Sequence, residues 1–132
     1  MAAVVSGAPS TVHALLTGRD PLEATLAAGS ILLPDEARRG RLLLAAVPVH
    51  IGVSLGWGVV LSRALPERRT VTLGALAGLA IAALDLGTVG RRLPRIRSLP
   101  LLPQLADHVA FGVSVAADLR RRRRSRCGGL WL

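Results

Sequence analysis

The chain has 132 residues, of which 51% are hydrophobic, and 17 basic against eight acidic residues give it a net charge of +9. Its apolar residues lie in uncharged or nearly uncharged blocks of about 16–21, long enough to cross the hydrocarbon core of a bilayer as helices. These blocks favour an integral membrane protein over a soluble helical bundle, whose apolar residues would fall in short amphipathic runs.

The high positive charge does not indicate nucleic-acid binding. Every basic residue is an arginine, a bias typical of a GC-rich bacterial genome. The arginines lie at the edges of the apolar blocks and near the carboxyl end, where membrane proteins commonly carry them. Only three aromatic residues are available for base stacking, Trp57, Phe111 and Trp131. A single cysteine, Cys127, excludes an internal disulfide.

The first apolar stretch, residues 2–17, predicts a short membrane span that contains Pro9. A new helix is then expected over residues 21–33. Asp20 is suited to cap it, Pro21 fits its first position and Glu23 its third. This second segment is too short to cross a bilayer and has polar ends, so we interpret it as an interfacial or re-entrant helix.

Two further spans are predicted over residues 42–62 and 71–90. Each contains two glycines four positions apart, the spacing that lets membrane helices approach closely. Gly112 lies in a Gly-Val-Ser triplet that also occurs at residues 52–54. The glycines expected to take part in helix packing are Gly52, Gly56, Gly74, Gly78 and Gly112.

The fourth span is predicted over residues 99–117, followed by a basic tail over 118–132. Five adjacent arginines are hard to translocate, so we expect the tail in the cytoplasm and, with four spans, both termini there. The same arginines are expected to attract anionic lipid headgroups. They are Arg120, Arg121, Arg122, Arg123 and Arg124.

Ionisable residues lie inside the apolar stretches, where each carboxylate costs about 2.5–3.5 kcal/mol on insertion scales. If successive helices alternate in direction and rise 1.5 Å per residue, these residues all fall in the same half of the membrane. They are His13, His50, Asp85, Asp107 and His108. We hypothesise that all of them except His13, which lies near a helix end, form a polar cluster between helices.

Three interpretations of this cluster remain open. In the first, the cluster holds the helices together through hydrogen bonds worth roughly 1 kcal/mol each. Alternatively, it handles protons or ions in a small transporter, since His and carboxylate groups relay charge. In the third, His50 and His108 ligate a haem from two parallel helices. No metal site is predicted, because adjacent residues such as Asp107 and His108 point about 100° apart on a helix.

Three segments of the sequence carry a resemblance to known proteins: Ser10–Leu15, Val49–Gly58 and Pro103–Gly112. They resemble small, uncharacterised four-helix membrane proteins of GC-rich, actinobacterial-type bacteria. The resemblance covers about residues 1–117; it implies a helical membrane protein and lends no activity.

The sequence therefore predicts an all-α, polytopic bundle of four spans and one interfacial helix, a multi-pass protein of the cell membrane. No nucleophile–base pair or cofactor-binding loop is present, so we expect a non-enzymatic membrane component without a cofactor. Its expected partners are the lipid bilayer and anionic lipids. A second copy of the chain or another membrane protein is left open as a packing partner.

Overall fold

The structure, a computed structural model, describes residues 6–68 and 70–128. This part of the chain is all helical and contains no strand, so the predicted all-α fold is confirmed. Its helices are α2 (Ala8–Leu16), α3 (Glu23–Gly29), α4 (Arg39–Ala64), α5 (Thr70–Arg92), α6 (Pro94–Arg97) and α7 (Leu101–Gly128).

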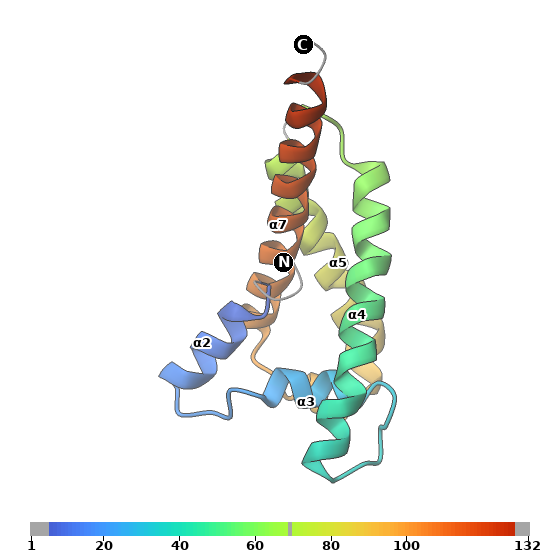
Figure 1. Ribbon diagram of the computed structural model, residues 1–132. Helices are drawn as coiled ribbons and strands as arrows, with labels where there is room; N and C mark the ends of the chain where they lie inside the picture. The colour runs from blue at the N-terminus through green and yellow to red at the C-terminus, as the bar shows by residue number, and fades with distance from the viewer. Residues whose placement is uncertain (1–5, 69, 129–132) are drawn as a thin grey trace.

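Three long helices form the body of the molecule (Figure 1). α4 and α7 run in one direction, and α5 runs back in the opposite direction, packed against α7. The end of α4, the start of α5 and the arginines of α7 lie toward the same end of the molecule, here called the tail end. α3 lies across the opposite end, here called the base, and α2 leans against the lower half of α7.

Two helices in the described chain are long and apolar enough to cross a membrane, α4 and α5. The predicted four spans are therefore not confirmed. α2 has nine residues, about 14 Å at 1.5 Å per residue, against a hydrocarbon core of about 30 Å. Residues 2–5 of the predicted first span lie outside the described residues.

Large apolar side chains are exposed along α4 and α5, and on α7 at its first two residues. Leu44 is 75% exposed on α4, Leu76 is 57% exposed on α5, and Leu102 is 78% exposed on α7. Only 6% of the most apolar stretch of α4 and 28% of that of α5 are buried, so most of this apolar surface has no partner within the described chain.

α4 packs against the rest of the chain mainly near its two ends. Its buried residues are Leu42 and Ala46 near the base and Leu61 near the tail end. Leu61 belongs to a core cluster with Ile81 of α5 and Phe111 of α7. The middle of α4 makes no comparable contact, and Ile51 and Leu55 in it are exposed.

α7 does not end where the fourth predicted span ends. It continues from Leu101 to Gly128, through most of the basic tail. Arginine is a good helix former, and neither proline nor glycine interrupts residues 113–127. Arg122 Nε also donates to Asp118 Oδ2 at 2.7 Å, an i,i+4 pair that supports the helix. The last four tail residues lie outside the described part.

Candidate functional site

Asp85 of α5 and His108 of α7 face each other across the interface between these helices. Asp85 Oδ2 lies 3.6 Å from His108 Nε2. Trp57 of α4 donates its indole N–H to the same carboxylate oxygen at 3.3 Å. The three side chains thus connect all three long helices, and we call them the Trp57–Asp85–His108 cluster.

The other ring nitrogen of His108 fixes how this cluster can be protonated. His108 Nδ1 lies 2.7 Å from the carbonyl oxygen of Gln104, which is only an acceptor, so Nδ1 carries a proton. In the neutral imidazole the Nε2 lone pair would then face the carboxylate of Asp85. A proton on Nε2 would instead be attracted to this carboxylate.

Asp107 is adjacent to His108 but contacts a different helix. Its Oδ1 accepts the backbone N–H of Ser10 at 2.9 Å. Ser10 is in the first turn of α2, whose N-cap, Gly7, provides no side-chain hydrogen bond. The first amides of a helix have no acceptor within it. Asp107 therefore caps α2 from α7, as a carboxylate at a helix N-terminus does favourably.

The remaining two residues of the predicted cluster lie apart from this site. His50 is on α4 and exposed, and His13 is half-buried near the end of α2. Neither imidazole forms a hydrogen bond or ion pair with any residue in the part of the chain that the structure describes. Of the predicted set, only Asp85 and His108 are brought together.

Small residues let α5 and α7 approach to backbone contact. A Cβ added at Gly74 would lie 2.6 Å from the carbonyl oxygen of Gly112 and 2.5 Å from the Cβ of Ala116. One added at Gly78 would lie 2.9 Å from the Cα of Val109. This close packing of α5 on α7 positions Asp85 opposite His108.

The other predicted glycine pair, Gly52 and Gly56 on α4, has open space around it. A Cβ at either position would meet nothing within 4 Å. A role for this pair in packing against another chain stays a prediction.

Ion pairs at the base hold α3, α4 and their connection. Asp20 pairs with Arg39 through both carboxylate oxygens. Glu36 Oε1 accepts the backbone N–H of Arg38 at 2.9 Å, and its other oxygen lies 3.3 Å from Arg41. These hydrogen bonds lower the pKa of Glu36 from 4.5 to about 2, the bond from the Arg38 amide having the largest effect.

The arginines of the tail point in different directions because consecutive residues turn by about 100° on a helix. Arg122 pairs with Asp118, whereas Arg123, one position on, donates from Nη2 to the carbonyl oxygen of Leu65 at 3.0 Å. Arg120 lines a hollow beside the turn between α4 and α5. The run is thus not one uniform charged surface.

Three residues that form contacts between helices were not predicted from the sequence. Trp57 donates to Asp85, the backbone N–H of Ser10 donates to Asp107, and Gly29 lets α3 approach the backbone of Leu42 on α4. Trp57 had a usable signal, because a lone indole within an apolar stretch usually finds an acceptor when it is buried. The other two depend on contacts between helices that no local pattern encodes.

No group of three or more His, Cys, Asp or Glu residues within residues 6–68 and 70–128 is arranged to hold a metal ion. Comparison of the chain with protein-family models, with curated proteins and with solved structures finds no match.

Proposed function

We propose that this chain is a non-enzymatic, multi-pass protein of the cell membrane in which α4, α5 and α7 cross the bilayer. The observation that carries the proposal is the exposed apolar surface of α4 and α5, each with arginines near both of its ends in the sequence. α7 enters as a third span because its apolar part runs beside α5 and ends at Arg120. We do not include a fourth crossing, because α2 is too short.

The contiguous arginines favour the tail end on the cytoplasmic side. Cys127 makes this testable, as it is the only cysteine of the chain. In spheroplasts, a membrane-impermeant maleimide should label Cys127 only after permeabilisation. The matched control carries Cys127→Ser and Ser98→Cys, which moves the thiol to an exposed position at the base, and it should be labelled without permeabilisation. The opposite pattern would invert the orientation.

Membrane integration is tested separately by extraction with alkaline carbonate. An integral protein stays in the pellet, because carbonate removes only peripheral proteins. Release of the chain into the supernatant would refute the proposal, whatever the labelling shows.

A second candidate function is proton or ion handling at the Trp57–Asp85–His108 cluster. The observation favouring it is the placement of His108, whose Nδ1 lies 2.7 Å from the carbonyl oxygen of Gln104 while its Nε2 lies 3.6 Å from Asp85 Oδ2. Intramembrane ionisable groups are candidates for such roles. In proteoliposomes containing a pH-sensitive dye, Asp85→Asn should abolish any flux of the wild type, whereas Asp107→Asn, which can still cap α2, should retain it. A wild type without flux would leave the cluster with a packing role.

The haem alternative receives no support from this geometry. Both ring nitrogens of His108 face protein atoms, the carbonyl of Gln104 and the carboxylate of Asp85. A ring nitrogen that is to bind iron must instead face the open space of a pocket.

A further inference from the structure

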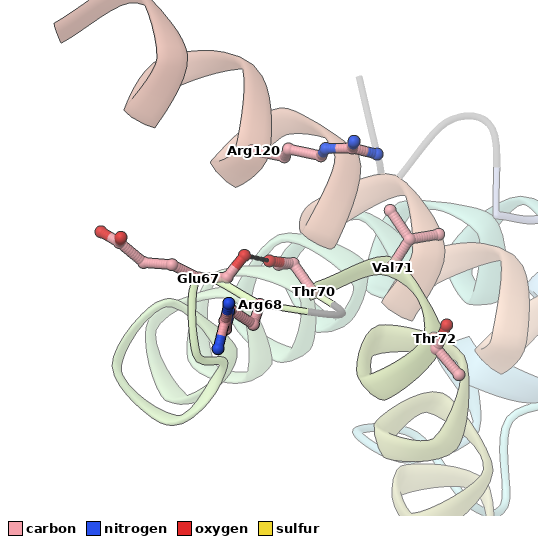
Figure 2. Close-up of a pocket in the computed structure, with 6 residues that line it drawn as sticks. All are labelled: Glu67, Arg68, Thr70, Val71, Thr72 and Arg120. Carbon is pink, nitrogen blue, oxygen red and sulfur yellow. Dashed lines mark hydrogen bonds between the residues drawn. The ribbon is translucent and has the colours of Figure 1, made fainter. Parts of the chain in front are cut away.

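A hollow at the tail end lies where α4, α5 and α7 meet. It is lined by Glu67 and Arg68 from the turn after α4, by the first residues of α5, and by Arg120 of α7. Figure 2 shows Arg120 on one side of Thr70 and Arg68 on the other, with the carboxylate of Glu67 directed away from both. Two cationic side chains from separate elements thus flank the hollow.

Neither arginine is neutralised by the protein. No acidic side chain in the described chain forms an ion pair with Arg68 or Arg120. At the base, Asp20, Glu23 and Glu36 all pair with arginines. At this corner Glu67 forms no ion pair within the described chain, so no acidic side chain compensates Arg68 or Arg120 there.

A third arginine lies beside the hollow without lining it. Arg123 is one helical turn beyond Arg120, and its Nη2 donates to the carbonyl oxygen of Leu65 at 3.0 Å. Its side chain is thus held by the turn after α4, and its charge adds to the positive potential of this corner.

The hollow also lies at the level where the apolar parts of the long helices end. α4 ends at Ala64, α5 begins at Thr70 and the arginine run of α7 begins at Arg120. If these helices cross the bilayer as proposed above, the apolar surface ends here and lipid phosphates begin. The first amides of α5, which have no acceptor within that helix, line the same hollow and add to its attraction for anions.

We propose that this hollow binds the phosphate group of an anionic phospholipid, with Arg68 and Arg120 as its two cationic contacts. This assignment rests on the proposed membrane location and goes beyond a general attraction of the tail for anionic lipids. It names two arginines that act together and implies that other tail arginines contribute little. The shared chemistry is a phosphate oxyanion, and the source we assign is a lipid headgroup rather than free phosphate.

The test uses the full chain, purified in a neutral detergent, with retention of added lipid measured by native mass spectrometry. The lipids are phosphatidylglycerol and, as the zwitterionic comparison, phosphatidylcholine. The test variant carries Arg68→Gln and Arg120→Gln. The matched control carries Arg121→Gln and Arg124→Gln, which removes the same charge from exposed residues that do not line the hollow.

At roughly fivefold per arginine, we expect the test variant to retain about 25-fold less phosphatidylglycerol than the wild type. The control variant should retain less than about twofold less, because Arg121 and Arg124 do not line the hollow. Retention of phosphatidylcholine should be weak and equal in all three proteins. Equal losses of phosphatidylglycerol in both variants would overturn the proposal in favour of diffuse attraction. So would unchanged retention in the test variant.

Two further measurements separate a lipid site from a phosphate site and from a failure to fold. Inorganic phosphate, added at the concentration of the lipid, should not displace phosphatidylglycerol; displacement would assign the hollow to free phosphate instead. If the double variant fails to fold, Arg68→Gln alone is used, since no hydrogen bond of the described chain involves the Arg68 side chain, and it should lower retention about fivefold. Because binding is measured in detergent, the outcome is separate from the carbonate test of membrane integration.

Discussion

Replacing Gly74 by alanine should force α5 and α7 apart. The new Cβ would lie 2.6 Å from the carbonyl oxygen of Gly112, about 0.8 Å short of the 3.4 Å at which ordinary van der Waals contact begins. The clashing atom belongs to helix backbone, so it cannot move aside as a flexible side chain can. Overpacking of this kind costs about 1–3 kcal/mol. A separation of this size also weakens the remaining contacts along the interface.

The control is Gly87→Ala on the same helix, where an added Cβ meets nothing within 4 Å. Both substitutions bring the same gain in helix propensity, about 1 kcal/mol, so their difference isolates the packing cost. Reversible unfolding in mixed micelles of a mild detergent and SDS measures it. We expect the Gly74→Ala variant to be less stable than the Gly87→Ala variant by about 1–3 kcal/mol. Equal stabilities would refute the close approach of α5 and α7.

A partial rescue tests the same contact from the other helix. Ala116→Gly removes the side chain whose Cβ lies 2.5 Å from the position of the new one. Combined with Gly74→Ala, it should recover part of the lost stability, because residues in contact are not additive. The recovery should be incomplete, since the carbonyl of Gly112 remains in place.

Three other substitutions give sharper expectations. Asp107→Ala removes the cap of α2 and should lower the free energy of unfolding by about 1 kcal/mol and speed amide hydrogen exchange over residues 8–14, whereas Asp107→Asn keeps an acceptor and should do neither. Trp57→Phe removes the hydrogen bond to Asp85 and should cost about 1 kcal/mol in the same unfolding assay. Because the pKa of Glu36 is lowered on folding, its contribution to stability is present above pH 4.5 and is lost as the pH falls toward about 2. Glu36→Gln should therefore flatten the pH dependence of unfolding in that window.

Three results would contradict these expectations. Slow exchange over residues 8–14 in the Asp107→Ala variant would mean that α2 does not depend on this cap. An unchanged stability of Trp57→Phe would show that the indole N–H finds an equivalent partner elsewhere. If Glu36→Gln leaves the acid unfolding profile as it is, the hydrogen bonds of this carboxylate do not persist in solution.

The helical fold and the pairing of Asp85 with His108 could be anticipated from the sequence because both follow from spacing. Apolar blocks set the helices, and a common rise per residue sets the depth of each ionisable group. Depth alone, however, does not specify direction around a helix axis. His50 shares the predicted half of the membrane with His108, but it is exposed on α4 and forms no contact with the pair.

The role of Asp107 could not be anticipated for the same reason. Asp107 and His108 are adjacent, so their side chains leave α7 in different directions and meet different helices. His108 reaches α5, whereas Asp107 reaches the first turn of α2. Likewise, the two glycine pairs are identical in spacing, and only the one on α5 meets a neighbouring helix within this chain. The choice depends on how the helices pack, which the local pattern does not contain.

The contrast between the glycine pair on α4 and the glycine pair on α5 shows how the long helices are held together. α5 and α7 meet backbone to backbone, and so they form a rigid unit. α4 is held near its ends, by Leu42 at the base and Leu61 at the tail end. In the described chain, Trp57 to Asp85 is the one hydrogen bond that joins α4 to α5. Between its two packed ends, α4 is therefore tied to the α5–α7 unit by the side chain of Trp57, which also packs against the core cluster.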